Sequence, residues 1–171
     1  MKLQTAQRSQ VKLRLGLSGA SGFGKTYSAL LLAHGITNDW TKIAIIDTEN
    51  NSASLYSDLG NYNVISFSEP YSPERYIKAI KTCEEAQIDV IIIDSTHEWQ
   101  GTGGCLHIHE QLGGRFQDWA KVSPRHQAFI DAILQSKAHV ITTVRSKIDY
   151  SMDSSSNGKT KVVKHGLKSI T

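Results

Sequence analysis

Eight consecutive residues, Gly19 to Thr26, place three glycines, a lysine and a threonine in the pattern G-x-x-x-x-G-K-[ST]. Glycines let a backbone curl so that successive N–H groups point at one anion. Lys25 adds a charge that reaches the outer phosphates of a nucleoside triphosphate, and Thr26 offers a hydroxyl to Mg²⁺. The pattern predicts a phosphate-binding loop for ATP and Mg²⁺. Its nucleotide-binding residues are Gly19, Ala20, Ser21, Gly22, Phe23, Gly24, Lys25, Thr26 and Tyr27.

A metal-holding carboxylate is needed beside such a loop, and Asp94 is the candidate. It follows the apolar run Val90–Ile93 and precedes Ser95, which is the pattern of a Walker B strand. Asp94 and Thr26 are therefore the expected metal ligands. The alternative is that Asp94 only caps a loop.

Hydrolysis also needs a base for the attacking water, and no glutamate follows Asp94 directly. Glu49 stands two residues past Asp47, just beyond a second apolar run, Ile43–Ile46. We expect Glu49 to hold and polarise the water. Asp47 is the alternative base, and a third interpretation is that both acids cap the next helix.

Arg145 and Lys147 follow another apolar segment and are two residues apart. Arg145 is a candidate catalytic residue, either as a sensor of the γ-phosphate or as a finger that reaches a neighbouring subunit's nucleotide. The competing interpretation is a solvated strand edge.

The elements that must position these residues alternate between strand and helix. Continuous apolar runs are typical of strands buried on both faces of a parallel sheet, and Ser-Pro pairs are typical of helix starts. The sequence predicts an α/β fold, a three-layer sandwich around a mostly parallel sheet. The expected strands are 11–18, 42–48, 63–68, 88–94, 138–144 and a short 160–165; the expected helices are 26–36, 72–86 and one opening at Ser123-Pro124.

Residues 95–114 contain no confident element and are rich in glycine, which predicts a mobile loop or a loop-helix insert. Trp99, Phe116 and Trp119 flank it and could stack on bases or anchor the loop. Arg115, Lys121 and Arg125 could contact phosphate or only solvate a helix. His107, His109 and Glu110 lack a metal-site pattern and are expected to be structural.

Composition excludes several classes of protein. The chain has 171 residues, 39% of them hydrophobic and 20% charged, which indicates one globular domain over residues 1–171. Its two cysteines, Cys83 and Cys105, are in no metal-binding spacing, which argues against a disulfide framework or a structural zinc site and favours a reducing, cytoplasmic location. No apolar run approaches the roughly 20 residues of a membrane helix, and no secretory signal is present. Net charge is +3, with a basic excess after residue 136.

The segment "IDTEN" after the second strand, together with the "IIIDS" strand, resembles the RecA/RadA recombinase ATPases. The phrases "HEWQGTGGC", "DWAKVSPRH" and "VRSKIDY" are similar to compact phage and prophage RecA-like (RadA/Sak-type) ATPases, over residues 12–171. The resemblance implies a RecA-like P-loop NTPase core with sheet order 3-2-4-5-1, with Glu49 as the base. It also implies bacterial or phage-infected host cells as the source.

In that family, two mobile loops bind single-stranded DNA, and they map to residues 100–114 and 151–166. The second carries the lysines Lys159, Lys161, Lys164 and Lys168, which are the expected DNA-binding residues. We expect both loops to be poorly ordered without DNA. Further partners implied are copies of the same chain, in a ring or filament, and a single-strand DNA-binding protein; no membrane partner is expected.

The sequence departs from the family at three places, the first being the N-terminal polymerisation segment of classical recombinases, which is expected to be missing or reduced to about ten residues. A γ-phosphate-sensing glutamine is replaced by Thr142 and Thr143, followed by Arg145. The phage group generally continues past the equivalent of Thr171, so the C-terminus is expected to be truncated. The function that these observations favour is a DNA-stimulated ATPase of phage-type recombination or annealing. Alternatives are a nucleotide-kinase-like phosphotransferase, an ATPase with a non-DNA target and a ParA-like switch, although the last lacks its extra P-loop lysine.

Overall fold

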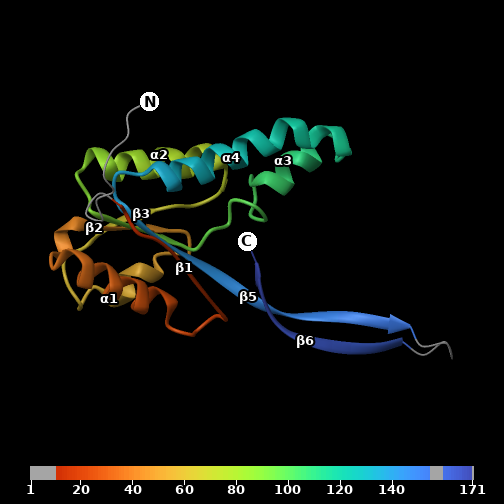
Figure 1. Cartoon of the computed structure of the whole chain (residues 1–171), viewed down its shortest axis with the longest axis horizontal. Coiled ribbons are helices and arrows are strands. Elements are labelled where there is room, and N and C mark those ends of the chain that lie inside the picture. Colours follow the sequence, from red (N-terminus) through yellow and green to blue (C-terminus); the bar gives the residue numbers. More distant parts are fainter. Residues whose placement is uncertain (1–10, 155–159, 171) are drawn as a thin grey trace, which may run out of the picture.

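A computed structural model describes residues 11–154 and 160–170 of the chain. Strands and helices alternate along most of it (Figure 1). The strands are β1 (Arg14–Gly19), β2 (Ile43–Asp47), β3 (Asn63–Ser66), β4 (Val90–Asp94), β5 (His139–Ser154) and β6 (Thr160–Ile170). The helices are α1 (Lys25–Thr37), α2 (Pro73–Glu85), α3 (Cys105–Gln111) and α4 (Trp119–Gln135), with short 3-10 turns η2 (Trp40–Lys42), η3 (Ser52–Tyr56) and η4 (Phe116–Asp118).

Five strands form a parallel sheet in the order β3-β2-β4-β5-β1, which confirms the predicted order 3-2-4-5-1. The order places β5 between β1 and β4, so the strand that leads into the phosphate loop does not neighbour the strand of Asp94. Direct pairing of those two strands would have favoured the kinase-like alternative. β6 lies outside this parallel order and pairs with β5 in the antiparallel sense.

The central strands β2 and β4 are buried on both faces because helices cover both sides of the sheet (Figure 1). Ile45 and Ile92 pack on the side of α1, where Leu30 and Ala33 are fully buried. Their neighbours in sequence point to the other side and pack against Tyr76, Ile80 and Phe129 of α2 and α4. Alternation along each strand therefore builds two cores, and the predicted three-layer α/β sandwich is confirmed.

The two Ser-Pro pairs have different roles. Pro73 is the first residue of α2, as predicted. Pro124, in contrast, lies inside α4, which begins five residues earlier at Trp119, so the predicted helix start was wrong. The turn η4 leads directly into α4, and the helix accommodates a residue without an N–H close to its N-terminal end.

The longest departure from the prediction concerns β5 and β6. The fifth strand was expected to end at Val144, but it runs to Ser154, and β6 runs to Ile170 instead of His165. Residues 145–154 and 160–170 form a two-stranded hairpin that extends away from the sheet (Figure 1).

No helix within the described part of the chain is long and apolar enough to cross a membrane.

Candidate active site

The loop between β1 and α1 has the curled backbone that phosphate binding requires. Gly22 and Gly24 have φ angles of 81° and 73°, in the left-handed region that favours glycine. The ammonium of Lys25 donates a hydrogen bond of 2.9 Å to the carbonyl of Ala20, across the loop. The loop therefore curls around the side chain of Lys25. Helix α1 begins at this residue, so the N–H groups of its first turn are directed toward the space enclosed by the loop.

Asp94 is the last residue of β4, is 2% exposed and accepts two hydroxyl hydrogen bonds. Thr26 donates to its Oδ2 over 2.5 Å, and Thr143 of β5 donates to its Oδ1 over 2.5 Å. A hydroxyl and a carboxylate beside a phosphate loop are oxygen ligands of the kind that Mg²⁺ prefers. Thr26 and Asp94 are therefore the residues that would hold the ion, with Thr143 fixing the orientation of the carboxylate.

Glu49 follows β2 and is enclosed by a polar network. Its Oε1 accepts a hydrogen bond of 2.8 Å from the hydroxyl of Ser95 and lies 3.5 Å from Nε2 of His97. Its Oε2 accepts a hydrogen bond from Arg145 of β5. His97, Ser95 and Arg145 favour the ionised carboxylate and outweigh its partial burial, so the pKa of Glu49 falls from 4.5 to about 2.

Asp47, the alternative base, is used differently. It is buried, and its two carboxylate oxygens accept hydrogen bonds from the backbone N–H groups of Glu49 and Ala53, at 2.7 and 2.8 Å. These contacts fix the turn that follows β2. Asp47 therefore positions Glu49 at the carboxyl edge of the sheet, where the strand ends of β2 and β4 meet.

A cavity of about 320 Å³ joins the phosphate loop to both acids. The structure brings eight of the predicted site residues to its wall; three are Ser21, Gly22 and Gly24 of the phosphate loop, and the others are Lys25, Thr26, Glu49, Asp94 and Arg145. Ser52, Leu55 and Tyr56 complete the lining. Gly19, Ala20, Phe23 and Tyr27 lie outside the lining, and Phe23 is 70% exposed.

The two expected DNA loops are largely folded. The segment 100–114 contains α3, with Cys105 and His109 buried, so the expectation of a poorly ordered loop was wrong there. Trp119 explains the order, because it stacks on Trp99 at 5.6 Å and on His109 at 4.0 Å between ring centroids. Both tryptophans are anchors of this segment, whereas Phe116 is 92% exposed.

The second expected loop, 151–166, consists mainly of paired strands. β5 covers 151–154, and β6 covers 160–166 and continues beyond it. Lys161, Lys164 and Lys168 therefore belong to a strand, while Lys159 lies outside the described residues. The alternation of Ile148, Tyr150 and Met152 along the sequence is the signal that indicates a continuing strand.

Sequence reasoning missed three residues of the site. Ser95 and His97 follow Asp94 closely and contact Glu49 only because the ends of β2 and β4 are adjacent. Thr143 was noted as a replacement for a glutamine, but its hydrogen bond to Asp94 was not foreseen. Arg125, a candidate for contact with phosphate, instead pairs with Glu74 of α2 at 2.5 Å.

Comparison with protein families gave a match over nearly the whole described chain. A family model described as an AAA domain matches residues 11–169, which include β1 to β5, all but the last residue of β6 and every residue of the cavity wall. A comparison with curated proteins gave no match.

Proposed function

The chain belongs to the AAA domain family of P-loop ATPases, and from this premise we propose that it hydrolyses ATP in a reaction stimulated by single-stranded DNA. The observation that carries the proposal is the network around Glu49. It joins the expected base to His97 and Ser95, on the segment after β4, and to Arg145, at the root of the hairpin.

In the proposed reaction, Glu49 accepts a proton from a water that attacks the γ-phosphorus, and the bond to the bridging oxygen of ADP breaks. Lys25 and the N–H groups of the loop bind the phosphates. Thr26 and Asp94 would hold Mg²⁺, which would supply positive charge against the negative charge of the phosphates. A carboxylate with a pKa of about 2 is a weak base, so we expect its contacts to change before it accepts a proton.

Activation then requires Arg145 to leave Glu49. Arg145 lines the same cavity as Lys25. The γ-phosphate of a nucleotide bound in that cavity is therefore the anion that we expect Arg145 to contact. This supports the sensor role over a finger that reaches a neighbour. Once the ion pair opens, the pKa of Glu49 rises toward its ordinary value and the carboxylate becomes a stronger base.

The DNA part of the proposal rests on surface chemistry. The hairpin carries Lys161, Lys164 and Lys168 in β6. Exposed Arg115 and Phe116 lie between α3 and α4, and exposed Lys121 lies in the first turn of α4; both helices and the hairpin reach toward the right in Figure 1. Cations for the phosphates and an aromatic ring for a base are the elements of single-strand binding. A role in phage-type recombination or annealing, with the chain as a homo-oligomer, extends this proposal.

The test is ATP turnover with and without a single-stranded oligonucleotide, beside a fluorescence titration of that oligonucleotide at two salt concentrations. We expect stimulation by DNA and binding that weakens with salt. Lys25→Ala should abolish ATP binding and turnover alike. Turnover without DNA binding at low salt, in either nucleotide state, would leave an ATPase with a non-DNA target. Micromolar ATP affinity in Lys25→Ala would contradict the nucleotide site itself.

A further inference from the structure

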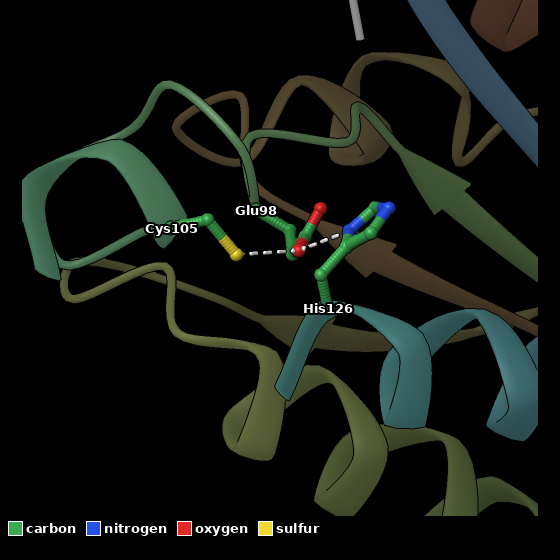
Figure 2. A group of neighbouring side chains, drawn as sticks. All are labelled: Glu98, Cys105 and His126. Carbon is green, nitrogen blue, oxygen red and sulfur yellow. Dashed lines mark hydrogen bonds and ion pairs between the residues drawn. The ribbon is translucent and has the colours of Figure 1, made fainter. Parts of the chain in front are cut away.

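Three side chains with metal-binding atoms converge outside the ATP cavity. Glu98 comes from the segment after β4, Cys105 is the first residue of α3, and His126 lies in α4 (Figure 2). Their ligand atoms all lie within 4.8 Å of one another. Figure 2 shows the carboxylate of Glu98 between the other two: its Oε1 is 3.0 Å from Sγ of Cys105 and 2.8 Å from Nδ1 of His126.

The cluster is buried on one side and open on the other. Cys105 is 0% exposed and Glu98 is 4% exposed, whereas the side chain of His126 is 35% exposed. Burial and the neighbouring Glu98 both raise the pKa of the Cys105 thiol, so the thiol keeps its proton and donates it weakly to the carboxylate. A buried carboxylate is costly unless it is paired or coordinates a metal, and Glu98 is paired here with a thiol, which is a weak donor, and with the imidazole of His126.

We propose that Glu98, Cys105 and His126 form a Zn²⁺ site. Thiolate, imidazole and carboxylate are the three ligand types that zinc takes in proteins, and three protein ligands with an open fourth position are a usual zinc arrangement. The exposed edge of His126 provides the path by which the ion enters and the place where a water completes the tetrahedron.

The distances fit after a small adjustment. Tetrahedral bonds of about 2.3 Å to sulfur and about 2.1 Å to nitrogen and oxygen separate neighbouring ligand atoms by about 3.4–3.6 Å. The two observed separations, 3.0 and 2.8 Å, must therefore open by about half an ångström, which slight side-chain rotations achieve. In the structure, the hydrogen bonds that join Cys105 and His126 to Glu98 occupy the space that the ion would take.

Zinc binding exchanges the protons of those hydrogen bonds for the ion without a redox change. The S–H bond of Cys105 breaks, its proton leaves to solvent, and a Zn–S bond forms. The imidazole proton of His126 moves from Nδ1 to Nε2, which frees the Nδ1 lone pair for the metal. Binding of the ion therefore releases one proton to solvent.

The site escapes sequence motifs because its members are far apart: Cys105 follows Glu98 by seven positions, and His126 follows Cys105 by twenty-one. The spacing of the cysteines in the sequence therefore argued against a structural zinc site. The fold nevertheless brings the three possible ligands together. The site ties three elements together, since α3, α4 and the segment after β4 each provide one ligand. Glu98 adjoins His97, so an ion here also steadies the network around Glu49.

The experiment titrates chelator-treated full-length protein with Zn²⁺ in the presence of excess Mg²⁺, by calorimetry and thermal unfolding, and with Co²⁺ as an optical reporter. We expect one equivalent bound, a raised Tm and a thiolate-to-cobalt charge-transfer band. Cys105→Ala and His126→Ala should each weaken Zn²⁺ binding by more than about 100-fold. Cys83→Ala and His107→Ala, which change the same residue types outside the cluster, should bind as the wild type does.

Absence of stoichiometric binding, or a cobalt spectrum without the thiolate band, overturns the proposal. Equal affinity in Cys105→Ala and Cys83→Ala does so too, because it shows adventitious binding elsewhere. Thermal unfolding without metal checks that each variant folds. If Cys105→Ala does not fold, His126→Ala decides, since His126 is partly exposed and its ring packs only edge-on against Trp99; unchanged affinity in that variant also overturns the site.

Discussion

The carboxylates of Glu49 and Asp47 stand two residues apart yet have separate partners. The partners of Asp47 are backbone N–H groups, and those of Glu49 are the side chains of Ser95, His97 and Arg145. Glu49→Gln should therefore retain ATP binding but turn ATP over at least about 100-fold more slowly, because the amide cannot accept the proton of water. Nucleotide binding and single-turnover hydrolysis, measured on one preparation, check this result.

Asp47→Asn is the matched control. It should cost about 1 kcal/mol of stability, through weaker hydrogen bonds to Glu49 and Ala53, and change turnover much less. The reverse pattern, with an inactive Asp47→Asn and an active Glu49→Gln, would make Asp47 the base.

Glu49 also predicts a dependence of stability on pH. Its pKa in the folded state is about 2, below the ordinary 4.5, so its ion pair stabilises the fold fully above pH 4.5 and progressively less as the pH falls toward 2. Urea unfolding between pH 6 and pH 3 should show this loss, and Glu49→Gln should flatten it. Glu74, whose pKa Arg125 also lowers to about 2, contributes in the same window and remains in the variant. An unchanged pH profile in Glu49→Gln would show that the network does not form in solution.

At the scale of elements, α2 fixes the segment that follows β4. Tyr76 is fully buried in α2, and its hydroxyl accepts a hydrogen bond of 3.1 Å from the backbone N–H of His97. Tyr76→Phe should cost about 1–2 kcal/mol, because that N–H loses its partner. It should also reduce stimulation by DNA several-fold, since His97 then holds Glu49 less firmly.

Tyr62→Phe is the control for this element. The hydroxyl of Tyr62 donates a hydrogen bond to the carbonyl of Ala53, so its loss should lower stability without changing stimulation. Thermal unfolding and ATP turnover separate the two effects. Equal stimulation in both variants would show that the contact with α2 does not reach the site.

The same scale explains what the sequence could and could not predict. Apolar runs such as Val90–Ile93 predict buried parallel strands, so the layers follow from local patterns, whereas the strand order came from the family resemblance. Pro124 misled the prediction because a helix start depends on the turn before it. The contacts of Ser95 and Thr143 arise where separate strands end side by side, and no local pattern encodes that adjacency.

At the scale of the whole molecule, binding of DNA should depend on salt through the basic hairpin. Each phosphate neutralised on a single strand contributes about −0.7 to the slope of log K against log salt. Replacing Lys159, Lys161, Lys164 and Lys168 by Ala should therefore reduce the slope by up to about 3, equally for all base sequences. ATP affinity should stay unchanged, because the phosphate loop is untouched. Oligonucleotide titrations across a salt series measure both slope and affinity.

The control removes the same number of charges elsewhere on the surface, at Lys12, Lys78, Lys81 and Lys137, all of them exposed. This variant should keep a slope near that of the wild type. Similar losses in the two variants would mean that net charge, rather than the hairpin, attracts DNA.

The hairpin can act as a lever, because its root lies in the wall of the ATP cavity and its other end extends away from the sheet. β5 pairs with β1 as far as Arg145, opposite Gly19, and from there onward pairs only with β6. Nine residue steps separate Arg145 from Ser154, a length of about 30 Å. A sideways pull of about 5 Å at the tip turns the root by about 10°, which displaces a long side chain there by about 1 Å. Since a hydrogen bond tolerates only a few tenths of an ångström, a displacement of this size would break the pair between Arg145 and Glu49.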